Sequence, residues 1–512
     1  MLGFFSNKSD HPLANLKSAQ QLLDALPKTD SVEVLYEVGH WIESLFDSAN
    51  EFRADHQFAV LRILDEAAHP HLRKISQSYF AVVPPIPFQE NRLWGAMHEY
   101  LGFCAQGYLH LLRAARDGEK GSSALKPNMP LIIARGMYAL FRRVECMKVR
   151  YTQMDAQCWL DLADLYDYAE VLSCQDELLQ VYMGGANSNI SIKRLFASML
   201  AWHSVAVGAL KPLDLHIAKY LITHISKYFA VTDSNLPGSL FVFDLARPSS
   251  PMRLLAEGAQ YPASMRFVST KTPPAYIDNL LKTLDKNLIP EEFSLDVVYG
   301  AEQVADVLRR LTAFFQESLP VRRHQRRKIQ MTIQAANGFL PVLEQAEAGL
   351  NLLGAGSDVC AVEDISSGGL RFVLAADQSI PVTIGSLVSL KTENTAHCGV
   401  GIVRRLRRDM QGSLHVGVKM LASRVDVVLL YGNDNINPAS LALSLESAEV
   451  HEGECWLLMP PDSYSQTRSP TMRQGDESYL LLPLTVVEKG MDFDLVRYRK
   501  MLQDSSTDEA DY

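Results

Sequence analysis

The spacing of the apolar residues changes at Pro320, and this change limits the folds that the chain can adopt. Before Pro320 the apolar residues recur mainly every three or four positions, which places them on one face of an α-helix. After Pro320 the apolar runs are short, β-branched and partly alternating, as is typical of β-strands. The chain is therefore predicted to be a multidomain α + β protein: a large all-α region, then a small antiparallel β-barrel and a short β extension.

Residues 1–318 are predicted to form a mainly helical region, either a bundle or a solenoid-like array without a fixed repeat. The clearest helical stripe consists of Ile133, Met137, Leu140, Val144 and Met147. The basic residues of the same window are expected mostly on the other face, and they are Arg135, Arg142, Arg143 and Lys148. Helix breaks are expected at Pro70 and at other Pro- and Gly-containing segments. Residues 234–300 are predicted to be irregular, with short strands such as 240–243, and a further helix is predicted at 304–315.

The β-rich part is predicted to begin with a small barrel over residues 319–432. Its strand-like runs are 371–374, 381–390, 401–407 and 414–420. Further strand-like runs at 455–459 and 479–487 predict a β-rich extension over residues 433–503. Residues 504–512 are acidic and polar, and are predicted to form a disordered tail.

Composition and charge narrow the class of protein further. Hydrophobic residues make up 47% of the 512 residues and charged residues 21%, so the chain is expected to fold. The net charge of −10 argues against a protein whose whole surface binds nucleic acid.

The cysteines and the apolar windows indicate the cellular compartment of the protein. The seven cysteines are scattered without CxxC spacing, which favours neither a disulfide scaffold nor a zinc ribbon. The most apolar window, 195–210, contains Trp202, His203 and Ser204, so it is interpreted as a buried helix. The first residues lack the apolar core of a signal peptide. Together these features predict a soluble cytoplasmic protein without a membrane span.

One group of positive charges stands out against the overall acidity. It follows Pro320 directly and consists of Arg322, Arg323, Arg326, Arg327 and Lys328. Further along the chain, residues 363–372 read EDISSGGLRF. The two segments give an RRxxxR motif, formed by Arg322, Arg323 and Arg327, followed by a DxSxxG motif, formed by Asp364, Ser366 and Gly369.

In these two motifs and in their order, the chain resembles the PilZ family of cyclic di-GMP receptors, whose signature is RxxxR upstream of DxSxxG or NxSxxG. The segment 399–421, GVGIVRRLRRDMQGSLHVGVKML, is also similar to the closing strands of that six-stranded barrel. The resemblance covers residues 320–430 and leaves the helical region unassigned. Two departures are a long gap before Asp364, with an insert around 338–356, and a choice of register between Arg322/Arg326 and Arg323/Arg327. The second register completes RRxxxR and is preferred.

The resemblance implies a site for cyclic di-GMP, and the residue types suit that ligand. A guanidinium can bind guanine O6 and N7, stack on a base or clamp a phosphate. Asp364 can accept hydrogen bonds from guanine N1–H and N2–H₂, which selects guanine over adenine. Ser366 can donate to a phosphate or fix the turn. Gly368 and Gly369 are expected to allow positive φ and close approach of the ligand.

Each feature also has a simpler interpretation. RxxxR alone is common in solvated basic linkers, and DxSxxG alone is a common turn pattern. The later basic run, 404–408, divides its charges between the two faces of a strand and has no interleaved aromatic residues. A nucleic-acid polymer is therefore not predicted as a partner.

The sequence lacks the signatures of common enzymes and metal sites. It has no GxxxxGKS/T phosphate loop, no GxGxxG after a strand and no GxSxG elbow. An HExxH pattern that starts at His98 lacks its second histidine, because Gly102 stands there. His69 and His71 flank Pro70 and are interpreted as histidines at a helix end. The protein is predicted to be non-enzymatic, with no catalytic residue, no metal and no cofactor besides its ligand.

These observations predict a bacterial signal receptor that changes its domain arrangement when cyclic di-GMP binds. The ligand would contact both the connector at Arg323 and Arg327 and the barrel, and the helical region would bind a protein partner of unknown identity. The alternative is a PilZ-like interaction scaffold in pilus or surface assembly that does not bind nucleotide. Members of that kind typically lack the arginines or the DxSxxG loop, and both are present here.

Overall fold

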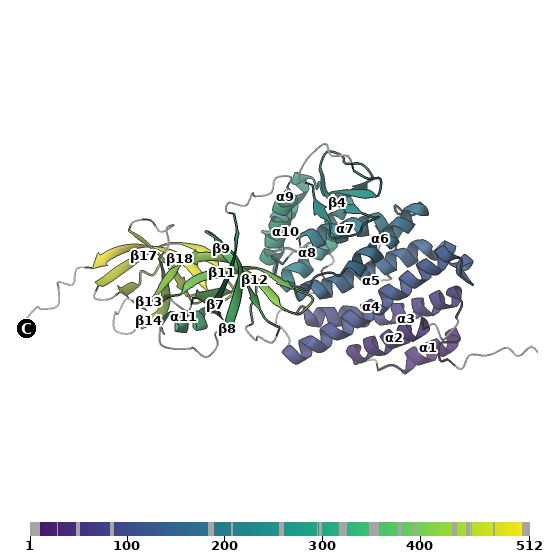
Figure 1. Cartoon of the computed structure of the whole chain (residues 1–512), viewed down its shortest axis with the longest axis horizontal. Coiled ribbons are helices and arrows are strands. Elements are labelled where there is room, and N and C mark those ends of the chain that lie inside the picture. Colours follow the sequence, from purple (N-terminus) through teal and green to yellow (C-terminus); the bar gives the residue numbers. More distant parts are fainter. Residues whose placement is uncertain are drawn as a thin grey trace, which may run out of the picture. The chain divides into compact units, whose positions relative to one another are not determined.

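The computed structural model describes residues 11–503 except 28, 48–51, 82–85, 183–188, 206–207, 255–260, 294, 296–298, 317–324, 348–357, 377–380, 393–394, 396, 433–437, 447–450, 452 and 475–476. The chain divides into two compact units, Met1–Leu319 and Pro320–Tyr512. Helices dominate the first unit and antiparallel barrels dominate the second (Figure 1). The predicted α + β fold class, with helices first and a barrel after them, is confirmed.

The first unit is built around long helices that pack on their neighbours in the chain. Its α-helices are α1 (Leu16–Ala25), α2 (Ser31–Leu45), α3 (Ala54–Tyr79), α4 (Pro87–Asp117), α5 (Met129–Val149), α6 (Ala156–Val171), α7 (Ile192–Val205), α8 (Pro212–Ile225), α9 (Pro274–Leu284) and α10 (Ala301–Phe314). Helices α2, α3 and α4 contact one another, and α4 packs along α5. Helix α5 also contacts α6, α7 and α8, so it lies at the centre of the unit (Figure 1).

The central position of α5 explains where the prediction for this helix was right and where it was wrong. Its apolar stripe is buried, and Met137 and Val144 are fully inaccessible. Arg135 and Arg142, which were expected on the exposed face, are only 2% and 5% exposed. Helices pack on several sides of α5. The buried carboxylates of Asp65 and Glu145 pair with the two guanidinium groups. Neither feature is visible in a local hydrophobic pattern.

Helix α3 continues through Pro70, so the break predicted there was wrong. Proline in a helix interior removes a hydrogen bond and costs about 3 kcal/mol. Leu72 and Ile75, which follow Pro70 on the same helix, are 2% exposed, and their burial offsets this cost. His69 and His71 therefore lie within the helix and not at its end: His69 stacks on Tyr182 with ring centroids 3.8 Å apart.

The irregular part of the first unit contains a small antiparallel sheet with the order β3-β6-β4-β5. Its strands are β3 (Ala230–Thr232), β4 (Ser239–Asp244), β5 (Met252–Arg253) and β6 (Met265–Ser269). Strand β4 contains the predicted strand 240–243, and α10 covers most of the helix predicted at 304–315. A short pair, β1 (Leu178–Leu179) and β2 (Ile190–Ser191), precedes α7.

The first barrel of the second unit has six antiparallel strands. They are β7 (Arg327–Asn337), β8 (Asp358–Ser366), β9 (Gly369–Leu374), β10 (Leu387–Lys391), β11 (Gly399–Arg408) and β12 (Leu414–Ala422). They follow the order β10-β11-β12-β9-β8-β7, and β7 pairs with β10 to close the barrel. Helix α11 (Phe339–Glu347) lies in the insert that the sequence placed around 338–356.

The predicted β extension is a second closed barrel. Its strands are β13 (Arg424–Tyr431), β14 (Pro438–Glu446), β15 (Glu454–Met459), β16 (Thr471–Gln474), β17 (Glu477–Lys489) and β18 (Asp494–Gln503). The sequence boundary at 432 was misplaced, because β13 starts only two residues after β12 ends. Closure leaves no unpaired sheet edge, which a short open extension would expose. The predicted tail at 504–512 lies outside the described residues.

A shared apolar core joins the two barrels. It includes Val342 of α11, Ile402 of β11, Leu443 of β14 and Leu458 of β15, all completely inaccessible. Helix α11 contacts β7 and β10 of the first barrel and β13 of the second. A salt bridge of 2.6 Å from Arg404 to Glu488 adds a polar link between the barrels.

None of the helices in the described part of the chain is long and apolar enough to span a bilayer. The apolar window 195–210 corresponds mainly to α7. In that helix Trp202 is completely buried, and its indole N–H donates to the carbonyl of Leu215 at 2.9 Å. This contact with α8 shows that the window packs within the first unit.

His203 on α7 predicts a pH dependence of stability. Its side chain lies against Trp159 and near Ser250, and burial, with a contribution from Lys148, lowers its pKa to about 3. An unfolded histidine titrates near pH 6.5, so the stability due to neutral His203 is complete above that pH and is lost as pH falls toward 3. Thermal unfolding should show a falling Tm between about pH 7 and about pH 5. The decline should be shallower for His203→Gln, and an identical decline would contradict this account.

Candidate functional site

The DxSxxG segment forms the end of β8, the turn and the start of β9. Ser366 and Gly369 are partners across this hairpin, and the Ser366 hydroxyl donates to the carbonyl oxygen of Gly369 at 3.0 Å. This contact corresponds to the turn-fixing role that the sequence suggested for Ser366. The carbonyl of Gly368 accepts a hydrogen bond from the backbone N–H of Met420 on β12, at 3.2 Å. The turn is therefore held from within and from the neighbouring strand.

Glycine is required in this turn at Gly369, for a reason other than the expected one. Gly368 and Gly369 are not among the described glycines with positive φ, so the expectation of a left-handed conformation was wrong. At Gly369, a Cβ atom would lie 2.2 Å from the carbonyl oxygen of Val418 on β12. Such a distance is incompatible with a side chain, so close approach of β9 and β12 requires glycine at this position.

Asp364 lies between two arginines, one from the segment just before β7 and one from β9. Its Oδ1 accepts a hydrogen bond from Arg326 Nη1 at 2.6 Å, and its Oδ2 lies 2.8 Å from Arg371 Nη2. The Asp364 side chain is 9% exposed, whereas both arginine side chains are 37% exposed. The carboxylate is thus nearly buried beneath two guanidinium groups that reach solvent, and each of its oxygens has one arginine partner.

A β-bulge in β8 places a second carboxylate beside Arg371. The pairing with β9 shifts between Val362 and Asp364, which leaves Glu363 as an extra residue. Arg371 is the regular cross-strand partner of Asp364 and contacts it with Nη2, and the bulge adds Glu363, which lies 2.7 Å from Arg371 Nε. Glu363 in turn lies 3.1 Å from His415 Nδ1 on β12. The bulge therefore links the turn to β12 through a continuous chain of polar contacts.

The two arginine registers are distinguished by the faces of β7. Lys328 is the cross-strand partner of Asp364, and Arg327 is the partner of Ile365. Since neighbouring residues of a strand point to opposite faces, Lys328 shares the face of Asp364 while Arg327 takes the other face. Arg326, which precedes β7, contacts Asp364 directly. Arg322 and Arg323 lie outside the described residues.

Of the candidate residues named from the sequence, the structure brings Asp364, Ser366, Gly368 and Gly369 together in one hairpin. Arg326, which belongs to the register that was not preferred, contacts Asp364. Arg327 lies on the other face of β7. Arg371 was missed, although its place two residues after the motif glycine is a usable signal. In a tight hairpin, a residue at that offset lies across from the motif aspartate.

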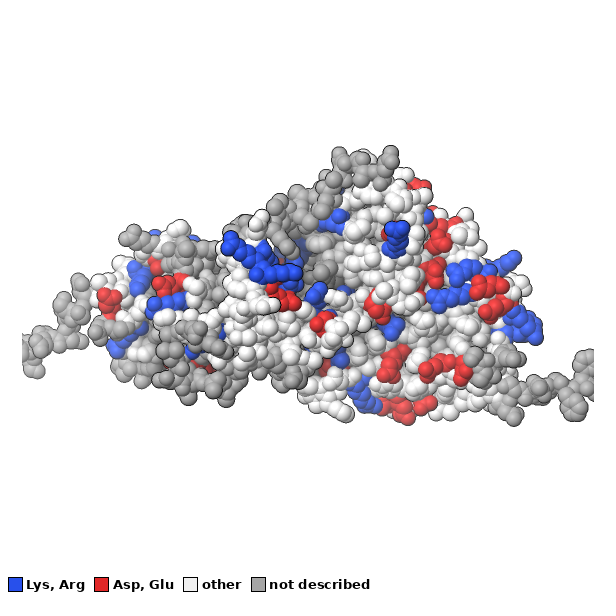
Figure 2. All heavy atoms as spheres, viewed as in Figure 1, with Lys and Arg blue, Asp and Glu red and all other residues white. Residues whose placement is uncertain are grey.

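The basic character of this face continues across the barrel. Gly417 on β12 is the partner of Arg371 on β9 and also of Arg405 on β11, so the two arginines flank a position without a side chain. Arg405 and Arg407 are exposed, and Leu406 between them is buried. Figure 2 shows basic side chains gathered, with acidic ones beside them, over the part of the first barrel where Figure 1 labels β9, β11 and β12.

This arrangement can bind an anion that also donates hydrogen bonds. Arg326, Lys328, Arg371 and Arg405 supply positive charge on one face, and Asp364 supplies the acceptor among them. Guanidinium groups bind phosphate bidentately, and a carboxylate accepts paired N–H donors such as those of guanine. Among the described residues, no group of three or more His, Cys, Asp and Glu side chains is arranged to hold a metal ion.

Comparison with known proteins gives a match for the helical region. Residues 17–235 match the family model described as the N-terminal domain of the cyclic-di-GMP receptor FimW. The matched range runs from α1 to β3 and includes neither barrel. No curated protein matches the chain.

Proposed function

We propose that the protein is a non-enzymatic cytoplasmic receptor for cyclic di-GMP, and that it binds the dinucleotide on the first barrel. The observation that carries this proposal is the Arg326–Asp364 contact, which joins the basic motif to the DxSxxG hairpin. The match of residues 17–235 to the N-terminal domain of a cyclic-di-GMP receptor supports it independently, because that match lies in the other unit. The seven buried, free cysteines suit a reducing compartment.

Binding exchanges one partner of Asp364 for another. Guanine N1–H and N2–H₂ take the place of Arg326 at the carboxylate, while Arg371 stays bound to Oδ2 and to Glu363. The carboxylate is nearly buried, so it must keep hydrogen-bond partners throughout, and guanine supplies them. The released Arg326 guanidinium stacks on the base or clamps a phosphate. The two negative charges of the ligand are balanced by the cations of the same face.

The position of Arg326 suggests how binding is communicated. It lies a few residues after the division between the units at Leu319 and Pro320. A ligand that takes over the contacts of Arg326 therefore acts on the chain next to this division, and we infer that it changes the arrangement of the two units. The helical region then presents a different surface to a protein partner. Small-angle scattering with and without saturating ligand tests this step, and identical profiles would contradict it.

Calorimetric titration of the full chain tests the receptor function. We expect saturable binding of cyclic di-GMP and much weaker binding of cyclic di-AMP, because adenine lacks the N1–H and N2–H₂ donors that Asp364 accepts. GTP is a control because it carries one guanine base where cyclic di-GMP carries two. If cyclic di-GMP produces no heat and does not compete with a labelled analogue, the receptor function is wrong and a scaffold without nucleotide becomes the better interpretation.

Two neighbouring substitutions decide the arginine register. Arg326→Ala should weaken binding of cyclic di-GMP by about tenfold or more, since a bidentate arginine contact contributes about 1–3 kcal/mol. Arg327→Ala is the matched control, because it removes the same charge from the other face of β7. Calorimetry of both variants measures the difference. A larger loss for Arg327→Ala would restore the register Arg323/Arg327.

A further inference from the structure

The two barrels share one topology. When the strands of each barrel are numbered from one to six in chain order, both follow the closed order 1-2-3-6-5-4. Every neighbouring pair is antiparallel in both barrels. This identity allows positions in the second barrel to be compared directly with those of the proposed cyclic-di-GMP site in the first.

The corresponding end of the second barrel has a different composition. Arg424 at the start of β13 and Glu446 at the end of β14 are cross-strand partners, and Arg424 Nε lies 3.4 Å from Glu446 Oε2. They lie at the ends of the first and second strands of this barrel that correspond to the ends of β7 and β8 near Arg326 and Asp364. The connection that follows Glu446 reads SAEVHEG and lacks the DxSxxG motif. The second barrel therefore does not repeat the first site.

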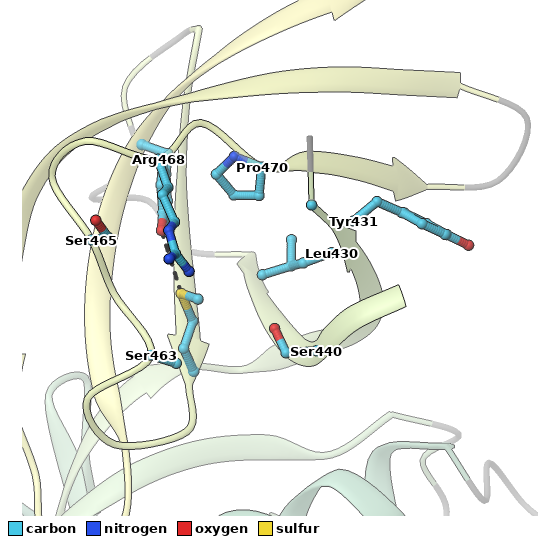
Figure 3. A pocket seen from close by; sticks show the side chains of 10 residues that line it. Leu430, Tyr431, Ser440, Ser463, Ser465, Arg468 and Pro470 are labelled. Atoms are coloured by element: carbon cyan, nitrogen blue, oxygen red, sulfur yellow. Dashed lines mark hydrogen bonds between the residues drawn. The ribbon is translucent and has the colours of Figure 1, made fainter. Parts of the chain in front are cut away.

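A pocket of about 370 Å³ lies at the opposite end of the second barrel. The ends of β13 and β15, the start of β14 and the connection from β15 to β16 surround it. Leu430, Met459 and Tyr498 are at most 3% exposed, and Pro470 adds a further apolar wall. Figure 3 shows Arg468 along one side of the pocket, across from Leu430 and Ser440.

Arg468 is the charged group of this pocket. Its side chain is exposed and makes no hydrogen bond or ion pair with any other described residue. Arg473 on the nearby β16 differs, because its guanidinium lies over the ring of Tyr431, 4.6 Å from the centroid. The Tyr498 hydroxyl is engaged with Met459 Sδ at 3.6 Å. The Arg468 guanidinium, which lies beside apolar walls, is therefore available to bind a ligand from solvent.

We propose that this pocket binds a small organic anion, with a carboxylate or phosphate at Arg468 and an apolar body against Leu430, Met459 and Pro470. The volume lies within the range of small-molecule sites, about 300–1,000 Å³, which combine apolar walls with few polar groups. A guanidinium fork matches both kinds of anion, and Ser440 supplies a hydroxyl on the other side. The site is separate from the proposed cyclic-di-GMP site and does not depend on it.

Ligand-observed NMR on the full chain tests the proposal with phenyl phosphate and benzoate as probes. Phenol and benzamide are the neutral controls, since they offer a similar ring without the charge. At least one anion should bind in the millimolar range, and Arg468→Gln should weaken it by about tenfold or more. Arg473→Gln removes a nearby cation outside the pocket and should leave binding unchanged. Ser440→Leu, which fills the pocket, should weaken binding without removing any positive charge.

Three results would overturn the proposal: neither anion binds, the neutral compounds bind equally well, or Arg468→Gln binds like the unchanged protein. Thermal unfolding of each variant establishes that the second barrel is folded when binding is lost. Cyclic di-GMP should bind equally to the unchanged protein and to Arg468→Gln. Failure of this pocket is therefore distinguishable from failure of the receptor function.

Discussion

Replacing Asp364 with alanine is expected to weaken the binding of cyclic di-GMP by about 10- to 100-fold, because the guanine then loses the acceptor that reads its N1–H and N2–H₂ donors. The same change releases Arg326 and Arg371 from the positions in which Asp364 holds them. Their side chains are 37% exposed, so water can solvate them, and the loss of stability should be small compared with the loss of binding.

Asp364→Asn is the matched control for this prediction. An amide oxygen still accepts one hydrogen bond, so this variant should bind cyclic di-GMP more tightly than Asp364→Ala and less tightly than the unchanged protein. Calorimetry gives the affinities, and the Tm of each variant shows whether the first barrel is intact. Unaltered affinity in Asp364→Ala would remove the hairpin from the proposed site.

Replacing Glu145 with alanine is expected to destabilise the helical unit by about 3–5 kcal/mol, the usual cost of leaving a buried charge without its partner. Glu145 on α5 is 1% exposed and binds three cationic or ionisable groups. Arg142 Nε lies 3.0 Å away, Lys219 Nζ 2.9 Å and His216 Nδ1 2.6 Å. The last two belong to α8, so the cluster also joins two helices.

The same cluster gives the pH dependence a definite sign. Burial alone would raise the pKa of Glu145, but Lys219, Arg142 and His216 outweigh it and lower the pKa well below its usual value. A carboxyl with a depressed folded-state pKa stabilises the fold above its unfolded pKa, about 4.3, and loses that effect as pH falls through the folded value. The difference in stability between the unchanged protein and Glu145→Ala should therefore be constant near neutral pH and shrink in strong acid.

Denaturant unfolding followed by tryptophan fluorescence measures this effect. Trp41, Trp94, Trp159 and Trp202 report on the helical unit. Glu43→Ala is the control, because Glu43 is exposed on α2 and its loss should change stability by no more than about 0.5 kcal/mol. Equal stability of the Glu43 and Glu145 variants would show that the buried cluster adds nothing to the fold.

Sequence reasoning succeeded where the signal is local. The helical stripe of α5, the short strand β4 and the helix α10 all follow from the spacing of apolar residues over one or two turns or a few strand positions. The strands β9, β11 and β12 were found in the same way. The prediction of a helix break at Pro70 failed, because packing of the rest of α3 overrides a local preference against helix.

In the candidate site, too, contacts within one segment could be predicted and contacts between distant segments could not. The DxSxxG hairpin could be predicted because its residues are neighbours in the chain and the turn itself brings them together. The partnership of Arg326 with Asp364 could not, since it depends on the pairing of β7 with β8 across an intervening helix. Arg371 lies across from Asp364 in the regular part of the hairpin, but its second carboxylate partner, Glu363, depends on a bulge, and no alternation pattern reveals a bulge in advance.

The sequence by itself determined the division near Pro320, most of the helices and the hairpin that carries the aspartate, because each depends on residues close together in the chain. Tertiary structure alone decided that the last part closes into a second barrel, which arginine faces Asp364, and that Arg135 and Arg142 are buried. Barrel closure and charge burial depend on contacts between distant segments. Their free energy arises only when those segments have met, so no window of sequence contains it.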